Sequence, residues 1–231
     1  MSCFALHGFL GLPSDLKDVS LDLITPNLFQ ESILPFWEWA ESFNENVRHR
    51  NAPRTLVGYS MGGRLALHAL LQNPNIWDSA ILVSTHPGLI SENERENRYQ
   101  QDLKWAEKMR NDPWDTLLDD WNRQSALSTS VPIARHESEF DRLQLAKAME
   151  IWSLGNQEDL RAMIAELEIP IRWVVGERDM KFCQLAKELC FKNIESKVVV
   201  VPKAGHRECL RSVKYYMDSQ WLCCAIHHRE Q

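Results

Sequence analysis

The chain has 231 residues, of which 44% are hydrophobic and 25% are charged. These fractions are typical of a folded globular protein and exclude a disordered, collagen-like or low-complexity chain. The formal net charge of −6 is spread along the sequence, which disfavours a nucleic-acid partner or an anionic membrane surface. No apolar run approaches the roughly 18 residues of a membrane-spanning helix, so we expect no membrane partner.

The cysteines and the first residues indicate the compartment. Six cysteines occur without a C-x-x-C pair or the spacing of a zinc finger, so we expect reduced thiols and no metal. The residues before His7 contain no basic segment followed by an apolar stretch, so no secretory signal is expected. Together these features predict a cytoplasmic protein.

In chain order, short apolar segments followed by turns predict strands, and apolar residues at helical spacing predict helices between them. The predicted strands cover residues 2–6, 21–24, 55–59, 80–84, 170–175 and 197–201, and the predicted helices cover residues 35–49, 62–72 and 208–224. Continuous apolar strands separated by helices favour an α/β fold with a mostly parallel sheet covered by helices on both faces.

Residues 92–168 differ from the rest of the chain, because they are charged, rich in tryptophan and lack strand-like runs. We interpret them as a helical cap inserted into a core that consists of residues 1–91 and 169–231. Packing between helices accounts for Trp105 and Trp152, whereas the role of Trp121 stays open.

Residues 58–62 (GYSMG) match the pattern G-x-S-x-G, and they follow a predicted strand and open a predicted helix. In that context the pattern forms a nucleophile elbow, a turn that lifts the Ser60 hydroxyl above the sheet edge. The helix N-terminus places the Met61 N–H where negative charge can be stabilised. The early turn at residues 7–9 should supply the Phe9 N–H as the second donor of an oxyanion hole.

A catalytic serine needs a base, and the base needs an orienting carboxylate. Asp179 and His206 each follow a predicted strand, in the chain order serine, acid, histidine that this elbow requires. The carboxyl ends of parallel strands are where open α/β sheets build their sites. Glu177 is a rival acid, but it falls closer to its strand. We therefore predict a catalytic triad of Ser60, Asp179 and His206.

These residues resemble the α/β-hydrolase superfamily and, within it, the synthases that form 2-succinyl-6-hydroxy-2,4-cyclohexadiene-1-carboxylate (SHCHC) in menaquinone biosynthesis. The resemblance runs over nearly the whole chain, and its markers are residues 7–11 (HGFLG), 58–64 (GYSMGGR), 86–89 (HPGL), 176–182 (GERDMKF) and 204–206 (AGH). It implies an α/β-hydrolase fold and a lyase that eliminates pyruvate from 2-succinyl-5-enolpyruvyl-6-hydroxy-3-cyclohexene-1-carboxylate. The triad would begin this reaction by removing a ring proton, without a cofactor or a metal.

Such a small polycarboxylate substrate needs cations near the serine. Arg64 lies one turn into the helix that Ser60 opens, and the resemblance places Arg98, in the predicted cap, at a carboxylate-binding position. Arginine suits two-point recognition of carboxylates. The substrate-binding set that the resemblance implies is Tyr59, Arg64, Arg98, Trp121, His7 and His86.

The sequence departs from the family in two places. His7 comes so early that the initial strand pair of many α/β hydrolases is missing, and residues 25–28 (TPNL) replace the usual Asp-x-Pro-Gly-His-Gly turn. Two alternatives stay open: a serine carboxylesterase or thioesterase that uses Ser60 as a nucleophile, and a non-catalytic ligand-binding module. Arg64 and Arg98 favour the lyase over an esterase for neutral acyl chains, and the complete triad disfavours the binding module. The sequence predicts no oligomeric state.

Overall fold

The computed structural model describes residues 2–17, 23–30 and 32–216. Its six strands form one sheet in the order β2-β1-β3-β4-β5-β6, and every neighbouring pair is parallel. The strands are β1 (Ser2–Leu6), β2 (Leu23–Ile24), β3 (Arg54–Tyr59), β4 (Ser79–Val83), β5 (Ile171–Gly176) and β6 (Lys197–Val201). The predicted parallel sheet is therefore confirmed; residues 21 and 22 of the second predicted strand lie outside the described residues.

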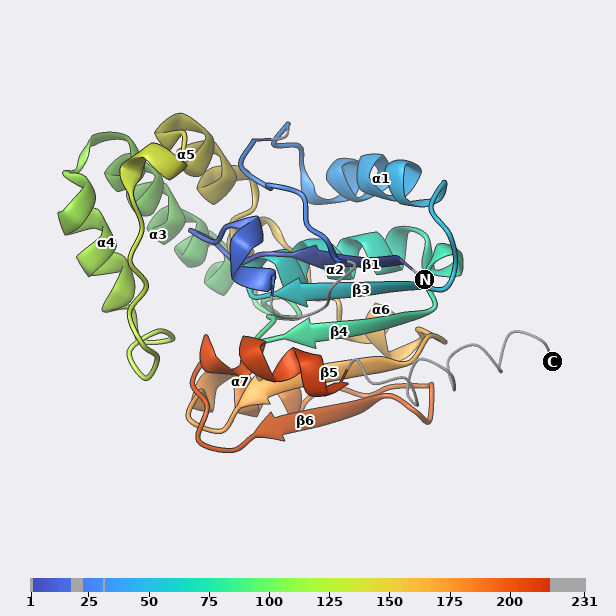
Figure 1. The fold of residues 1–231 in the computed structure, drawn as a ribbon. Helices are drawn as coiled ribbons and strands as arrows, with labels where there is room; N and C mark the ends of the chain where they lie inside the picture. Colours follow the sequence, from blue (N-terminus) through green and yellow to red (C-terminus); the bar gives the residue numbers. More distant parts are fainter. Residues whose placement is uncertain (1, 18–22, 31, 217–231) are drawn as a thin grey trace.

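The strand register aligns the carboxyl ends of the strands. Leu6 lies opposite Gly58 across the β1–β3 pair, and Gly176 lies opposite Val201 across the β5–β6 pair. The segments that follow these strands therefore leave the sheet at the same edge, which is the edge that the arrowheads mark in Figure 1. The residues of the predicted triad belong to these segments.

Successive side chains of the strands point to opposite faces of the sheet and form one apolar layer on each face. One layer contains Phe4, Leu56 and Trp173, and it packs against the helices of that face. These helices are α1 (Phe36–Val47), α2 (Met61–Gln72), α6 (Arg161–Ala165) and α7 (Met180–Ala186). On the opposite face, Val57 and Ile81 pack against two 3-10 helices, η1 (Pro13–Leu16) and η5 (Glu208–Tyr216). Helices thus cover both faces of the sheet.

The prediction of an α-helix over residues 208–224 is wrong for the part that the structure describes. Residues 208–216 form the 3-10 helix η5, whose buried side chains are Cys209, Leu210 and Val213. The rest of that range lies outside the described residues. The cysteines that the structure describes, Cys3, Cys183, Cys190 and Cys209, are not in disulfides.

A group of three helices lies beyond the carboxyl ends of the strands (Figure 1). It consists of α3 (Glu92–Asn111), α4 (Trp114–Asn122) and α5 (Arg142–Ile151), and we call it the helical cap. The side chains of Ser91 and Asp141 accept hydrogen bonds from the first turns of α3 and α5, which fixes where these helices begin. Residues 92–168 are all described and contain no strand.

The last part of this insertion returns to the sheet, because α6 packs beside α2 and the Leu160 N–H donates to the Pro87 carbonyl at 2.8 Å. Three short 3-10 helices, η2 (Pro74–Ile76), η3 (Glu137–Glu139) and η4 (Leu154–Asn156), complete the elements. The division into core and cap at residues 92 and 168 stays a prediction.

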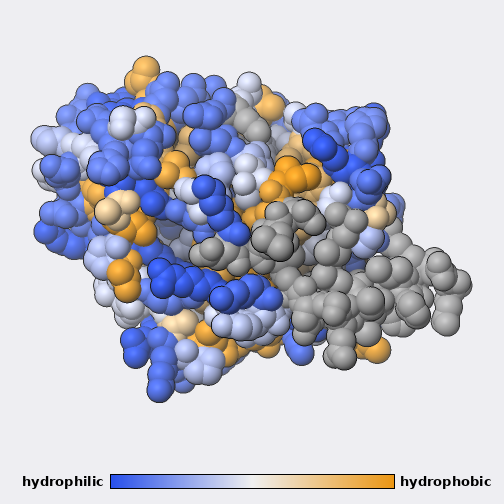
Figure 2. All heavy atoms as spheres, in the orientation of Figure 1, coloured by the Kyte–Doolittle hydropathy of each residue, from blue (hydrophilic) through white to orange (hydrophobic). Residues whose placement is uncertain are grey.

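The surface of the cap agrees with its charged sequence. Figure 2 shows mainly hydrophilic residues over the cap, at the left of the molecule. Among the described residues, no helix has both the length and the apolar character that crossing a membrane requires.

Candidate active site

The turn between β3 and α2 holds Ser60 in a strained conformation. Ser60 has φ of 53°, in the left-handed region that most residues avoid, and its side chain caps no helical N–H. Two glycines make the turn possible. A Cβ on Gly58 would lie 2.6 Å from the Cα of Gly63, and a Cβ on Gly62 would collide with the carbonyl oxygens of Leu6 and His7. The helix can therefore start directly against the strand ends and leave the Ser60 hydroxyl free.

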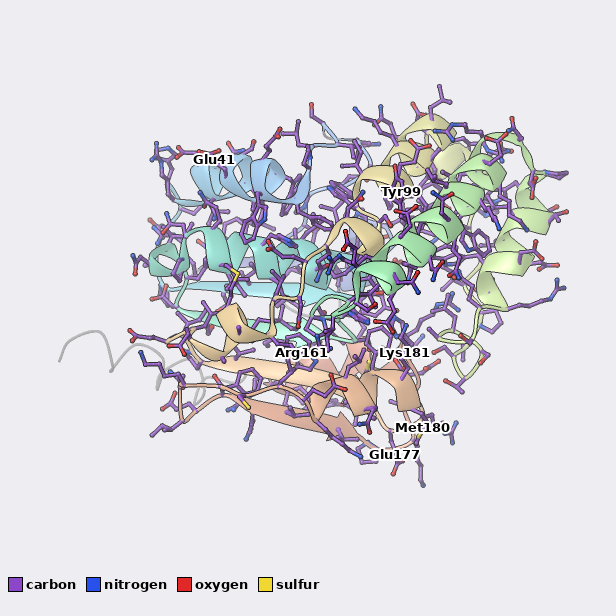
Figure 3. The ribbon with its side chains drawn as sticks, turned by 180° about the vertical axis from the view of Figure 1, so that it is seen from behind. Glu41, Tyr99, Arg161, Glu177, Met180 and Lys181 are labelled. Carbon is purple, nitrogen blue, oxygen red and sulfur yellow. The ribbon has the colours of Figure 1, made fainter. Side chains whose placement is uncertain are left out.

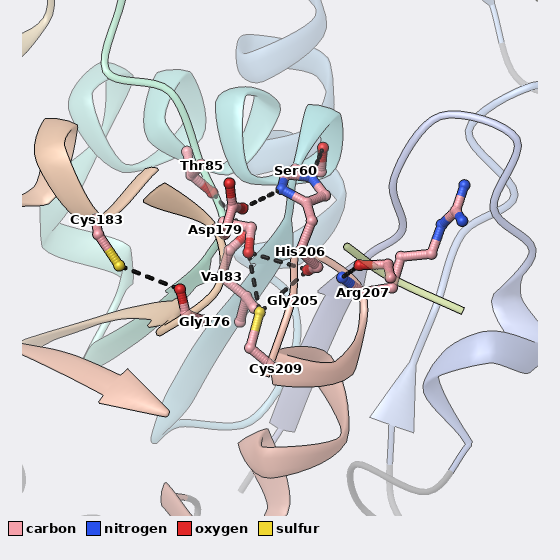
Figure 4. A network of polar contacts seen from close by, with 12 residues as sticks. Ser60, Val83, Thr85, Gly176, Asp179, Cys183, Gly205, His206, Arg207 and Cys209 are labelled. Atoms are coloured by element: carbon pink, nitrogen blue, oxygen red, sulfur yellow. Dashed lines mark hydrogen bonds and ion pairs between the residues drawn. The ribbon is translucent and has the colours of Figure 1, made fainter. Parts of the chain in front are cut away.

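The structure brings the three predicted triad side chains together. His206 Nε2 lies 3.0 Å from Ser60 Oγ, and His206 Nδ1 lies 2.6 Å from Asp179 Oδ2 (Figure 4). Asp179 and His206 are each only 3% exposed. An Asp179 carboxylate that accepts a hydrogen bond from Nδ1–H keeps the proton of the neutral ring on Nδ1 and leaves Nε2 free to accept the serine proton. This geometry suits a serine–histidine base relay.

The rival acid, Glu177, forms no hydrogen bond with His206 among the described residues. Its side chain is exposed, and its Oε2 accepts a hydrogen bond from the Lys203 N–H at 2.7 Å. In Figure 3, Glu177 and Met180 lie at the outer end of α7, away from the cap. Asp179 is therefore the carboxylate that the fold places against His206.

Two buried side chains hold the main chain of His206 through its carbonyl oxygen. The Ser84 hydroxyl and the Cys209 thiol both donate to the His206 carbonyl at 3.1 Å. Burial raises the pKa of the Cys209 thiol to about 12, so the thiol keeps its proton and remains a donor. The Phe182 ring lies 4.7 Å from the His206 ring, which limits the rotation of the imidazole. These contacts fix the position of His206 relative to Ser60.

The two expected oxyanion donors lie at this same point. Phe9 and Met61 line the cavity at Ser60, and no hydrogen bond among the described residues engages either N–H. Gly8 allows the turn after β1 to lie close to Tyr59 and Ser60, because a Cβ there would lie 2.8 Å from Tyr59 Cε1 and 3.5 Å from Ser60 Cβ. The turn after β1 and the start of α2 can therefore present two free N–H groups beside the Ser60 hydroxyl.

A cavity of about 280 Å³ opens from Ser60 and His206 toward the cap. Three cationic side chains line it: Arg64 from α2, Arg98 from α3 and Lys181 from α7. In Figure 3, Lys181 lies on the side of α7 that faces α3. Asp102 is the one carboxylate among the described residues that line this cavity. The excess of positive charge suits an anionic ligand.

Arg64 is buried without a carboxylate partner among the described residues. Its Nη2 donates to the Trp152 carbonyl at 2.7 Å, and its guanidinium lies 5.3 Å from the centre of the Phe36 ring. Burial, with the neighbouring charge of Arg98 as a second cause, lowers the pKa of Arg64. A buried cation without a counter-ion is costly, so an anion bound in the cavity would stabilise it.

His86 also lines the cavity, and it is neutral there. Its Nδ1 accepts a hydrogen bond from the Gly88 N–H at 3.1 Å, so the proton of the neutral ring belongs on Nε2. Burial and the surrounding cations, with Lys181 first among them, lower the pKa of His86 to about 2. His86 therefore offers one N–H donor and no charge.

His7 and Tyr59 lie elsewhere. His7 Nε2 accepts from the Leu28 N–H at 3.1 Å, and His7 Nδ1 lies 2.9 Å from the Gly8 carbonyl, so the ring links the Phe9 turn to the segment after β2. The lining of the 280 Å³ cavity does not include His7. Tyr59 lines a second cavity of about 400 Å³, which also reaches Ser60 and His206.

Trp121 lines both of these cavities. Its ring lies 4.9 Å from the Phe9 ring and 5.2 Å from the Trp105 ring, so it connects the cap to the turn after β1 that carries Phe9. Trp152 is buried, as packing between helices predicts, while Trp105 is only partly buried; both also border the first cavity.

Sequence reasoning did not single out Lys181 or Asp102. Lys181 could have been found, because it follows Asp179 by two residues and so leaves the sheet at the same edge. Asp102 lies in a charged helical segment, where the sequence offers nothing to distinguish it from a solvated residue. Among the described residues, no group of three or more histidine, cysteine or acidic side chains could hold a metal ion.

Comparisons with known proteins place the chain in a family. The family model described as serine aminopeptidase, S33 matches residues 40–208. A Haemophilus influenzae protein named for SHCHC synthase activity is 31% identical over 240 residues, covering 91% of this chain and 92% of the relative. An Escherichia coli SHCHC synthase is 31% identical over 204 residues, covering 86% of this chain and 72% of the relative.

Solved structures share the fold. MenH from S. aureus superposes with a TM-score of 0.82 at 21% identity, covering 100% of this chain and 95% of that one. A thermophilic esterase from Thermogutta terrifontis superposes with a TM-score of 0.71 at 20% identity, covering 97% and 90%. From the matched length and the identity to the curated relatives, the chain belongs to the α/β-hydrolase superfamily and, within it, to the family of the SHCHC synthases.

Proposed function

We propose that this protein is a lyase of menaquinone biosynthesis that eliminates pyruvate from 2-succinyl-5-enolpyruvyl-6-hydroxy-3-cyclohexene-1-carboxylate and releases SHCHC. The observation that carries the proposal is the set of three cations in the cavity that opens from Ser60 and His206. The substrate has three carboxylates, one each on the ring, the succinyl group and the enolpyruvyl group. An esterase for neutral acyl chains would have no use for this charge.

The chemistry begins with a ring proton. The ring carbon that carries the succinyl group lies next to a ketone, so its proton is acidic. Ser60 takes this proton while His206 Nε2 takes the serine proton, and Asp179 stabilises the imidazolium that forms. The 3.0 Å contact between Ser60 Oγ and His206 Nε2 is short enough for transfer of the serine proton, and the 2.6 Å contact between His206 Nδ1 and Asp179 Oδ2 lets the carboxylate stabilise the imidazolium.

Removal of the proton turns the succinyl ketone into an enolate. Its oxygen would lie against the Phe9 and Met61 N–H groups, which stabilise the developing charge. The electron pair then shifts through the ring double bond and breaks the carbon–oxygen bond to the enolpyruvyl group. This group leaves as the enolate of pyruvate, and its methylene carbon takes up one proton to give pyruvate. One proton leaves the ring and one joins the leaving group, so no cofactor or metal is required.

The substrate carboxylates would bind Arg64, Arg98 and Lys181, with the His86 N–H as a neutral donor. Trp121 and Tyr59 would border the ring from the two cavities that meet at Ser60. His7 would act only through the turn that presents the Phe9 N–H. We place this chemistry in the cytoplasm.

The test compares two reactions in the purified enzyme, pyruvate release from the enolpyruvyl substrate and hydrolysis of a short p-nitrophenyl ester. Wild type, Ser60→Ala and Arg98→Ala are measured side by side. We expect pyruvate release in wild type and a loss of at least about 100-fold in kcat/KM in each variant. Ester hydrolysis that depends on Ser60 alone, without pyruvate release, would overturn the lyase and indicate a carboxylesterase or thioesterase.

A further inference from the structure

The cavity contains a carboxylate that the proposed chemistry does not use. Asp102 lies in α3 and is only 2% exposed, although it borders a cavity whose other charged side chains are cations. A buried ion pair contributes little to stability, because desolvation of both charges offsets their attraction. An acidic group in a site for anions also opposes ligand binding. Because Asp102 contributes little to stability and opposes anion binding, we expect it to have another role in the site.

The contacts of Asp102 indicate that role. Arg98 Nε lies 2.9 Å from both Asp102 Oδ1 and Oδ2, and the Ser153 hydroxyl donates to Oδ2 at 2.8 Å. Ser153 is 1% exposed and directly precedes η4, so the carboxylate is fixed from a second segment. Among the described residues, no hydrogen bond engages the two terminal nitrogens of Arg98. The guanidinium is thus held through Nε, and its two-nitrogen end remains available.

We propose that Asp102, supported by Ser153, is the positioning residue that orients Arg98 to bind a substrate carboxylate with both terminal nitrogens. This inference rests on the proposed function for the identity of the substrate. The chemical class that Arg98 would take is a carboxylate, and two parallel N–H donors match its two oxygens. Without Asp102, the long arginine side chain would lose its fixed orientation, and part of the binding free energy would be spent on ordering it.

The charge of Asp102 makes the effect of its removal diagnostic. Asp102→Asn removes the one carboxylate among the described lining residues, which makes the cavity more positive. If Asp102 only reduced the net positive charge of the cavity, the variant would bind the polyanionic substrate more tightly and KM would fall. If Asp102 positions Arg98, KM rises and kcat/KM falls in spite of the added positive charge. The direction of the change in KM separates the two roles.

The experiment is a double-mutant cycle in the full chain, with pyruvate release as the first measurement. Asp102→Asn should lower kcat/KM by about tenfold or more, and Arg98→Gln should lower it further. In the Arg98→Gln background, Asp102→Asn should not lower kcat/KM, because there is no guanidinium left to orient. Ser153→Ala should give a smaller loss in the same direction. It keeps both charges, so it tests the proposal even if Asp102→Asn folds poorly.

Glu150→Gln is the matched control. It breaks the ion pair between Arg110 of α3 and Glu150 of α5, which joins two cap helices without lining the cavity. We expect kcat and KM of this variant to stay within twofold of wild type. Additive effects of Asp102→Asn and Arg98→Gln, or a lower KM in Asp102→Asn, would overturn the positioning role.

A second measurement, calorimetric titration with succinate, separates this inference from the proposed function. Succinate carries the carboxylate chemistry but undergoes no reaction. Asp102→Asn should weaken succinate binding when Arg98 is present and should not weaken it in the Arg98→Gln background. A wild type that releases no pyruvate would overturn the proposed function alone. Equal succinate affinity in wild type and Asp102→Asn would overturn the positioning of Arg98.

Discussion

At the scale of single residues, the contacts that the fold gives to two neighbouring acids, and not their distance in the sequence, decide which of them orients His206. Asp179 and Glu177 are two positions apart at the end of β5. Asp179 is buried and contacts His206 Nδ1, while Glu177 is exposed and accepts from the Lys203 N–H. A carboxylate can hold the imidazole in the required tautomer only from the Nδ1 side. The two residues therefore form a natural test pair.

We expect Asp179→Asn to lower kcat by about 1,000-fold or more, because an amide does not select the His206 tautomer with a free Nε2. Glu177→Gln is the matched control and should keep kcat within twofold of wild type. Steady-state kinetics of pyruvate release, with circular dichroism to check folding, measure both. A large loss in Glu177→Gln together with a near-normal Asp179→Asn would assign the acid to the wrong residue.

At the scale of elements, the site depends on how closely α2 approaches the end of β1. Gly62 lies where the first turn of α2 meets the Leu6 and His7 carbonyls, and its missing side chain is what permits the contact. The same approach sets the distance between the Met61 and Phe9 N–H groups, because Met61 begins α2 and Phe9 follows β1. The packing of α2 on β1 therefore also sets the geometry of the proposed oxyanion hole.

Gly62→Ala should push α2 away from β1. Alanine favours a helix over glycine by roughly 1 kcal/mol, but the collision with two carbonyl oxygens costs more. We expect the free energy of unfolding to fall by about 1–3 kcal/mol, which is the usual range for an overpacked core. The displaced donors should lower kcat more than they raise KM. Urea unfolding and steady-state kinetics check both effects, and a variant with wild-type stability and kcat would contradict the close packing.

At the scale of the whole molecule, three buried histidines couple stability to pH. His7, His68 and His86 are each no more than 5% exposed. Burial lowers the pKa of His7 to about 4, that of His68 to about 4 and that of His86 to about 2, from the ordinary value of 6.5. The unfolded chain therefore binds protons below pH 6.5 that the folded chain does not bind. Stability must fall as the pH falls through this range.

Between pH 6.5 and pH 5, we expect the free energy of unfolding to fall by roughly 1–2 kcal/mol for each of these histidines. Urea unfolding at the two pH values measures the loss. His68→Gln should remove about a third of it, because His68 is one of the three histidines whose pKa is lowered by burial. His49→Gln, at an exposed histidine, should leave the loss unchanged. Equal stability of the wild type at both pH values would contradict the prediction.

Much of the fold could be predicted from the sequence, because apolar periodicity and turn residues act locally. The six strands occur within one or two residues of their predicted limits in the described chain. The GYSMG turn and the order Ser60, Asp179, His206 also depend on local context, since each residue follows a strand. Residues 208–216 differ from the prediction, because their apolar spacing fits a helix but does not distinguish the 3-10 form from the α form.

What only the tertiary structure decided is the set of partners. Arg64 contacts the carbonyl of Trp152, 88 residues away, and His7 contacts the N–H of Leu28, 21 residues away. The pairing of Asp102 with Arg98 is local, but its burial at the cavity depends on Ser153 and the packing of the cap. The sequence alone determined which chemical groups are present and which strand ends they follow. The packing determined which of them meet, because contact and desolvation depend on the folded arrangement of distant segments and leave no local pattern.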